Sequence, residues 1–493
     1  MKRFFFWCAA AAVLFVFVFF GLNLFDAKSK PEAPAGLAAN LDPGNGFFIL
    51  WGFAEPPGTD PSAEAFGRRV RELFAAPRRD SHSRSRFGLW LAQLNTGARL
   101  HWQGASLYFP QLQEEDIGEY FAARRALVAE RQERFPALLL RYRQVLQAGE
   151  LADFTPLNWE FPSRCSLLAT YAARLFAASR VLAAVDGRWP DAGRDLLDAM
   201  DAGFKLIAAG RTLAVNSLGK TMAELSLRSL ASLLNRPDCP PSFARLVLEN
   251  LPARPARAFG TRSVRDFNWM SFAAAIERVK RDRIVDPFLL KDYFRDPAAF
   301  YAMERFVAIS GLRVYSVAHA LAAFFLKENE TVAMLRGFWE NMGRLEETPP
   351  WRWGKGARAA GRRTPALGLD APFWWLRNPL GKMMVSSAIP FSWPVLRHYV
   401  NRTHELKARY DLVRLLAQAR RMAGMKAELG EAALRRLLSA SGERDPFSGS
   451  PYRFGREREV LYSLGSDRRD DGGREQPEIW RDSDIAVPIR FIR

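Results

Sequence analysis

The amino-acid sequence predicts a mainly α protein with a single N-terminal transmembrane helix, a body of helical hairpins and a small α+β module at the C-terminal end. Three observations lead to this fold class. An uncharged apolar run fills residues 4–22, and apolar residues recur at helical spacing through most of 113–252. After a last long helix, the chain changes to short alternating segments separated by Gly, Pro and Asp.

The composition is that of a folded chain with a basic surplus. Of the 493 residues, 48% are hydrophobic and 25% are charged, which excludes global disorder and a disulfide-stapled miniature scaffold. A mean hydropathy of -0.16 excludes a polytopic membrane protein. Lys and Arg number 71 against 53 Asp and Glu, a net charge of +18, which favours partners such as nucleic acid, anionic lipid or another polyanion.

The apolar run near the N-terminus decides among these partners. Lys2 and Arg3 precede it, and its length suits a helix that crosses a membrane. We expect residues 1–25 to form an uncleaved signal anchor and 26–45 a linker. The N-terminus would lie in the cytoplasm of a bacterium and the bulk of the chain in the periplasm, attached to the inner membrane. A cleaved signal peptide and the reversed orientation are the alternatives. No nucleic-acid partner is expected in the periplasm.

Residues 46–348 are expected to form the helical body. Apolar spacing and Gly or Pro breakers predict helices over 166–185, from Trp189 to Gly210, over 212–235 and over 242–251. Further helices are expected over 263–281, 297–326 and 329–345, and residues 86–108 are ambiguous. Short connections between helices of this length predict antiparallel neighbours.

The two cysteines beyond the membrane run predict separate thiols. Cys165 and Cys239 precede the first and follow the third of three consecutive helices, so they should lie at opposite ends, roughly 30 Å apart for helices of about 20 residues. A disulfide needs Cα atoms within about 7 Å of each other. We therefore expect two buried thiols, with a disulfide as the alternative.

Residues 349–393 differ from the body because Pro, Gly, Trp and basic residues alternate there. From 351 to 382 there are seven Lys or Arg and one acid, Asp370. This mixture is typical of a loop that meets a membrane interface or another anionic surface. The alternative is a loop whose tryptophans pack on the helical body. The candidate anionic-surface patch comprises Trp351, Arg352, Trp353, Lys355, Arg358, Arg362, Arg363, Trp374 and Trp375.

No catalytic motif is complete. Residues 214–221 nearly match a phosphate-binding loop, but Ala214 stands where Gly is needed and the context is helical. Ser217 and Lys220 fit a Ser-x-x-Lys pattern whose companion motifs we do not find. The five histidines show no zinc-binding spacing.

Residues 394–493 are expected to form the C-terminal module, which begins with a helix over 394–425. Asp445 to Phe454 predict a turn that enters a strand, and Val460, Tyr462 and Leu464 alternate in a second strand, giving a hairpin. Seven acids with flanking glycines follow between 467 and 484. Such loops either bind Ca²⁺ through oxygen ligands or are simply solvated.

The order Asp-Pro-aromatic, Gly-x-Pro-Tyr-x-aromatic, Leu-Tyr-Ser-x-Gly-x-Asp, Gly-Gly and Asp-x-Asp-Ile resembles the globular end of the major pseudopilins of type II secretion, over about 400–487. The resemblance implies a calcium ion held by the side chains of Asp467, Asp482 and Asp484 beside the carbonyls of Leu464 and Ser466. The membrane run lies far upstream, so the chain is not itself a pilin. As a whole it resembles uncharacterised bacterial membrane-anchored proteins, which implies no activity.

Together these observations predict a non-catalytic interaction or assembly protein of the bacterial cell envelope, linked to a secretion or pilus-like system, with envelope proteins as partners. Two alternatives stay open. One is an envelope hydrolase whose site is assembled from distant residues, and the other is a protein that binds anionic lipid or another polyanion.

Overall fold

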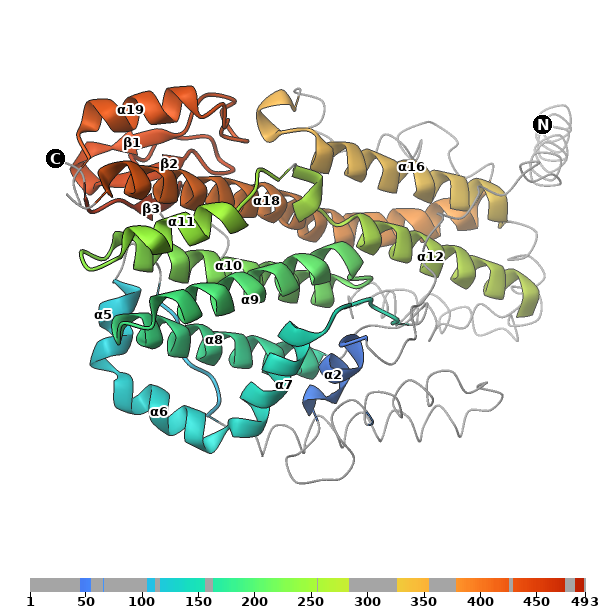
Figure 1. Ribbon diagram of the computed structural model, residues 1–493. Helices are drawn as coiled ribbons and strands as arrows, with labels where there is room; N and C mark the ends of the chain where they lie inside the picture. The colour runs from blue at the N-terminus through green and yellow to red at the C-terminus, as the bar shows by residue number, and fades with distance from the viewer. Residues whose placement is uncertain are drawn as a thin grey trace, which may run out of the picture. The chain divides into compact units, whose positions relative to one another are not determined.

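A computed structural model describes the chain in nine stretches and one isolated residue. Residues 1–44 of the predicted anchor and linker, the ambiguous segment up to 103 and all but the last residue of the helix predicted over 297–326 lie outside these residues. The described residues are 45–54, 65, 104–110, 116–155, 163–254, 256–282, 326–353, 378–424, 429–474 and 484–491. They are mainly α-helical, as predicted (Figure 1). They divide between two compact units.

The first unit contains the described residues of 265–345 and 353–400. Its described helices are most of α12 (Arg262–Asp282), most of α16 (Glu328–Glu347) and the first half of α18 (Pro379–Ala423). Their apolar faces share a core that includes Phe272, Leu335 and Val385. Buried Asn378 joins two helix starts, because its Oδ1 accepts hydrogen bonds from the backbone N–H of Lys327 and of Gly381.

The second unit contains residues 38–264, 346–352 and 401–493. Its first part is built from short helices: α2 (Phe47–Trp51), the 3₁₀ turn η1 (Gly52–Ala54), α5 (Ile117–Ala123), α6 (Arg125–Arg134) and α7 (Pro136–Gln147). Three long helices follow, α8 (Ser163–Val185), α9 (Trp189–Ala209) and α10 (Leu213–Asn235), and then α11 (Pro241–Asn250) and η2 (Ala256–Phe259). The predicted helices over 166–251 and those over 263–281 and 329–345 are thus confirmed.

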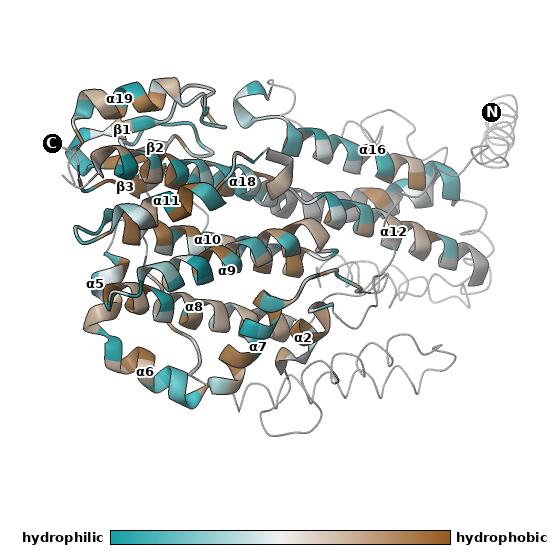
Figure 2. Cartoon of the chain, viewed as in Figure 1, coloured by the Kyte–Doolittle hydropathy of each residue, from teal (hydrophilic) through white to brown (hydrophobic). Residues whose placement is uncertain are grey.

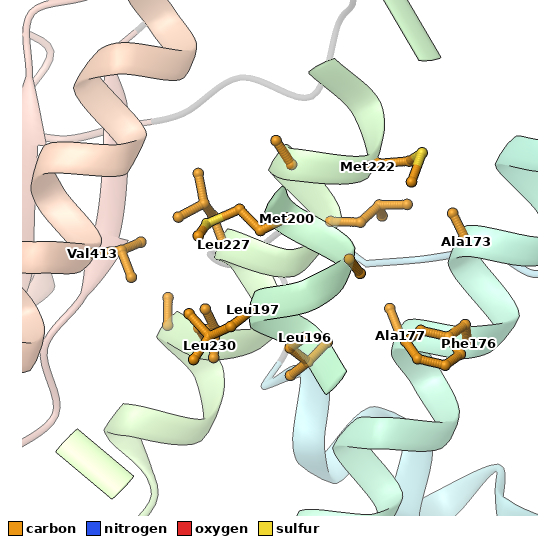
Figure 3. Close-up of a cluster of buried hydrophobic side chains, with 14 of the residues drawn as sticks. Ala173, Phe176, Ala177, Leu196, Leu197, Met200, Met222, Leu227, Leu230 and Val413 are labelled. Atoms are coloured by element: carbon orange, nitrogen blue, oxygen red, sulfur yellow. The ribbon is translucent and has the colours of Figure 1, made fainter. Parts of the chain in front are cut away.

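The core of the second unit lies where α8, α9, α10 and the second half of α18 meet. Leu196, Met200, Leu227 and Leu230 point into it beside Val413 of α18 (Figure 3). Figure 2 shows hydrophobic residues along α8 to α10, whereas α6 is largely hydrophilic and exposed. Helix α10 is therefore enclosed by neighbours, and most of its residues are buried.

Two glycines let α9 and α10 cross closely. A Cβ added to Gly219 would lie 2.6 Å from the carbonyl oxygen of Gly203, and one added to Gly203 would lie 2.7 Å from that of Gly219. Any larger residue at this crossing would force the two backbones apart. Gly219 belongs to the segment that resembles a phosphate-binding loop, and that segment lies inside α10, as its helical context predicted.

Helix α8 is apolar enough to span a membrane, but most of it is buried among other helices. In the described part of the chain, Cys165–Val185 is the stretch long and apolar enough to cross a membrane, and 72% of its most apolar window is buried inside the fold. Its neighbours in the second unit, α5, α7, α9 and α10, account for that burial. Its apolar character thus reflects packing in the core.

The C-terminal part forms the predicted hairpin and adds a third strand. Strands β1 (Arg453–Gly455) and β2 (Val460–Ser463) pair antiparallel across the 3₁₀ turn η7 (Arg456–Arg458), and β3 (Ile485–Pro488) pairs antiparallel with β2. Helix α19 (Glu431–Ala440) contributes Leu434 and Leu438 to the core of the second unit. Helix α18 begins at Pro379, so the predicted helix start near 394 was wrong. Proline is common in the first turn of a helix, which is why Pro394 suggested a start, but Pro390 and Pro394 both lie inside α18.

The sheet is fastened to the end of α10. The Nδ2 group of Asn235 donates a hydrogen bond to the carbonyl of Pro488 at 2.7 Å, and its Oδ1 accepts one from the backbone N–H of Arg490 at 2.9 Å. The guanidinium of Arg490 also pairs with Asp116, the N-cap of α5, at 2.8 Å. One buried amide and one ion pair thus join β3 to helices that are remote in sequence.

Neither of the two described cysteines, Cys165 and Cys239, forms a disulfide, and both are buried, as predicted. Cys165 lies at the start of α8, where its thiol is 3.5 Å from the carbonyl oxygen of Trp51, and Cys239 lies beyond the end of α10. Burial raises the pKa of Cys239 to about 11, so the thiol is protonated and unreactive at neutral pH.

Candidate functional site

The turn at 445–450 is organised by one buried carboxylate. Asp445 Oδ1 accepts hydrogen bonds from the backbone N–H of Phe447 at 3.0 Å and from the hydroxyl of Ser463 at 2.6 Å. Its Oδ2 accepts from the hydroxyl of Ser448 at 2.7 Å and the backbone N–H of Leu464 at 3.3 Å. Asp445 therefore ties the turn to strand β2, which is why an Asp stands at the start of the motif that the sequence singled out.

An exposed tryptophan from another segment packs against the turn at 445–450. Trp351, in the 3₁₀ turn η3 (Pro350–Arg352), is 40% exposed, and its backbone N–H donates to the carbonyl of Pro446 at 3.4 Å. Gly449 has a φ of +75°, and a Cβ there would lie 2.7 Å from the indole ring. The position thus needs glycine both for its backbone conformation and for the contact with Trp351.

Two arginines complete this surface. The guanidinium of Arg352 lies 4.7 Å from the centroid of the Trp351 ring, within the range of a cation–π contact. The guanidinium of Arg468 donates to the carbonyl of Pro350. We call Trp351, Arg352, Gly449 and Arg468 the tryptophan platform. It belongs entirely to the second unit, and it joins the first residues of the predicted basic patch to the C-terminal turn.

The other members of the predicted patch divide in two. Trp353 is half-buried and packs against the core of the first unit. The remaining members, Lys355, Arg358, Arg362, Arg363, Trp374 and Trp375, lie outside the described residues.

Four of the five predicted calcium ligands lie in the described residues, namely Leu464, Ser466, Asp467 and Asp484. Asp467 Oδ1 accepts a hydrogen bond from the backbone N–H of Arg469 at 3.0 Å, within its own turn. Leu464 is buried, Ser466 is half-buried, and Asp482 lies outside the described residues. Within the described part, no three His, Cys, Asp or Glu side chains are arranged to hold a metal ion.

Asp484 is the predicted ligand with the most unusual setting. It is fully buried, and its Oδ2 accepts backbone N–H groups of Asp471 at 3.0 Å and Gly473 at 2.8 Å. Its Oδ1 is buried and has no hydrogen-bond partner among the described residues. Burial raises the pKa of Asp484 to about 6, and the nearby carboxylates of Asp471 and Asp470 add to the rise. A cation beside Oδ1 would satisfy that oxygen and relieve the repulsion.

A second buried carboxylate joins α18 to the C-terminal turn. Asp411 Oδ2 accepts a hydrogen bond from the hydroxyl of Tyr452 at 2.8 Å and one from the ammonium of Lys407. Glu443 pairs with Arg414 and lies 3.8 Å from Lys407. Burial raises the pKa of Asp411 to about 6, opposed by Lys407 and assisted by Glu443.

The most perturbed base lies between α10 and α18. Lys220 is 3% exposed, and its ammonium donates to the hydroxyl of fully buried Thr403 at 2.9 Å. Burial lowers the pKa of Lys220 to about 7; Glu346 opposes this shift, and the positive charge of Arg402 adds to it. About half of the amine is thus neutral near pH 7. The side chains of Lys220 and Thr403 are both enclosed by protein. Such a contact is typical of a structural role, because a catalytic site must be open to its substrate.

Lys220 belongs to a polar stripe that follows α10 at a spacing of four residues. Asn216 donates to the carbonyls of Ile207 and Gly260, and Glu224 accepts from Arg402 at 2.9 Å. Burial alone would raise the pKa of Glu224, but guanidinium groups led by Arg402 outweigh it and bring the pKa to about 2. Sequence reasoning missed this stripe, although polar residues at 216, 220, 224 and 228 of an apolar helix are a readable signal.

Comparison of the chain with protein-family models, with curated proteins and with solved structures found no match.

Proposed function

We propose that the chain is a membrane-anchored, non-catalytic interaction protein of the bacterial cell envelope, and that it contacts its partner through the tryptophan platform. Residues 1–25 would hold it in the inner membrane with the bulk in the periplasm, as the charge pattern favours. Assembly around a secretion or pilus-like apparatus is the setting that the C-terminal resemblance implies.

The observation that carries this proposal is the state of Trp351. Its indole is 40% exposed, yet its backbone is held by Pro446, its ring contacts Gly449, and the guanidinium of Arg352 lies over it. A side chain fixed before binding loses little conformational entropy when a partner covers it. Trp and Arg are also the residues that most often dominate binding energy at interfaces.

Site-specific photocrosslinking in living cells tests the proposal. A photoreactive phenylalanine analogue at position 351 should give a light-dependent adduct of defined mass in the envelope fraction, either with an envelope protein or with a phospholipid. The matched control is position 422, where Met422 is 51% exposed on α18 of the same unit. If adducts form equally at 351 and 422, or at neither position, the platform is not the contact surface and the proposal is wrong.

A calcium ion is a second proposal, and it is supported by the buried Oδ1 of Asp484, which has no hydrogen-bond partner among the described residues. Asp484 would be the central ligand beside the loop 464–474, Asp467 and Asp482 would be the further side-chain ligands that the resemblance implies, and the ion would stabilise this loop. A chelator should lower the melting temperature of the full chain, and Asp484→Asn should remove the chelator's effect. An equal melting temperature with and without chelator would exclude a stabilising ion.

A further inference from the structure

We propose that the tryptophan platform is a docking site for the phosphodiester headgroups of an anionic bilayer, with Trp351 entering the interface and Arg352 meeting the phosphates. This inference rests on the proposed function, because it names the partner of the same surface. It concerns described residues of the second unit only.

The surroundings of Trp351 favour a bilayer over a protein partner. Protein interfaces place an aromatic anchor inside an apolar patch with a polar rim. The contacts that the structure gives around Trp351 are with Arg352, Gly449 and the backbone of buried Pro446, and none of these is a large exposed apolar side chain. The other large hydrophobic residues exposed in the described part are Tyr108, Leu140, Leu167 and Met422, each on a different segment. A single indole among polar groups is the arrangement of side chains that insert at a membrane interface.

The chemistry of the Trp351–Arg352 pair matches the two layers of that interface. An indole has an apolar body and one N–H donor, so it is most stable at headgroup depth. A guanidinium binds phosphate oxygens through paired N–H donors, and its contact with the ring keeps it beside the indole.

Charge and tethering also favour a lipid partner. Two guanidinium groups, those of Arg352 and Arg468, lie at the turn that carries Trp351, and the whole chain has a net charge of +18, which complements a negative surface. A chain with an N-terminal anchor always has that surface within reach, so weak contacts suffice for occupancy.

Vesicle binding by the full chain tests the inference. The chain is held in nanodiscs of phosphatidylcholine, so that its own anchor is occupied. It is then sedimented with vesicles of phosphatidylcholine alone or of phosphatidylcholine mixed with phosphatidylglycerol. We expect binding to the mixed vesicles only, weakened by salt, and roughly fivefold weaker for Arg352→Gln because one basic contact is lost. Trp351→Ala should weaken binding at least as much, whereas Leu140→Ala, at an exposed leucine of α7, should match wild type.

Three outcomes would overturn the inference. The first is equal binding to both vesicle types, and the second is a Trp351→Ala variant that binds like Leu140→Ala. The third is failure to bind mixed vesicles while polyglutamate is bound, which would assign the surface to an acidic protein. If vesicles are not bound but position 351 still crosslinks to an envelope protein, the proposed function stands and only its lipid partner is wrong.

Discussion

The buried amine of Lys220 makes a prediction about stability and pH. Its pKa is about 7 in the folded chain and 10.5 when exposed. Between these values the unfolded chain holds a proton that the folded chain has released. Raising the pH therefore favours folding in this window, with a slope approaching 1.4 kcal/mol per pH unit. Because the amine is half-titrated at pH 7, the gain from pH 7 to 9 is about 2 kcal/mol.

The measurement is urea unfolding of the full chain in non-ionic detergent, followed by tryptophan fluorescence at pH 7, 8 and 9. The free energy of unfolding should rise with pH in wild type and lose about 2 kcal/mol of that rise in Lys220→Met. Lys205→Met is the matched control, because Lys205 on α9 has a side chain that is 42% exposed. Taking the difference between variants also cancels the opposite effect of Cys239, whose raised pKa favours unfolding as the pH passes 9.

The reasoning is refuted if Lys220→Met keeps the wild-type slope. That result would mean that water or local movement keeps the amine charged near pH 9, and that its burial in the core is incomplete. A Lys205→Met variant that loses the slope would refute it equally.

Three further predictions concern the packing of the second unit. Gly219→Val should lower the free energy of unfolding by roughly 3 kcal/mol or more, because the added Cβ would meet the carbonyl oxygen of Gly203. Thermal melting measures this loss. Gly337→Ala is the control, because a Cβ at position 337 has open space around it. Asp445→Ala should cost roughly 2–4 kcal/mol in urea unfolding, since it leaves buried hydroxyl and backbone donors without an acceptor; a loss below 1 kcal/mol would contradict its role in the turn. Asp411 has a raised pKa of about 6, so the folded chain keeps a proton that the unfolded chain loses above pH 4, and stability falls as the pH rises from 4 to 6. Asp411→Asn should remove up to about 3 kcal/mol of that fall, and an unchanged pH profile would show that the carboxylate is solvated.

Local patterns predicted the helices well, and the reason is physical. Helices α8 to α11 end within a few residues of the predicted positions, because Gly210 and the prolines near 237–241 interrupt the chain where the apolar spacing also stops. The hairpin followed from alternation and a glycine-containing turn, which are equally local.

The sites depend on partners that are distant in sequence, so local reasoning could not reach them. Lys220 meets Thr403 across 183 positions, and its pKa depends on that pairing. Gly449 lies in the turn that the sequence predicts between Asp445 and Phe454, but its contact with Trp351 joins two segments that no spacing rule connects. The calcium ligands and the remaining basic patch stay predictions.

The division of the chain between its two units has a consequence for biosynthesis. The first unit's residues 265–345 and 353–400 interrupt the second unit, whose long helices α8 to α10 are made well before the half of α18 that covers α10. While the ribosome adds this intervening stretch, the polar stripe of α10 and the apolar faces around it stay uncovered, because the second half of α18 has not yet been synthesised. Completion of the core therefore coincides with the arrival of the last strands, and a chain cut short before residue 401 would display the open flank of α10 to chaperones and proteases. Truncated chains thus differ from complete ones in the exposure of α10, and quality control in the cell can recognise that difference.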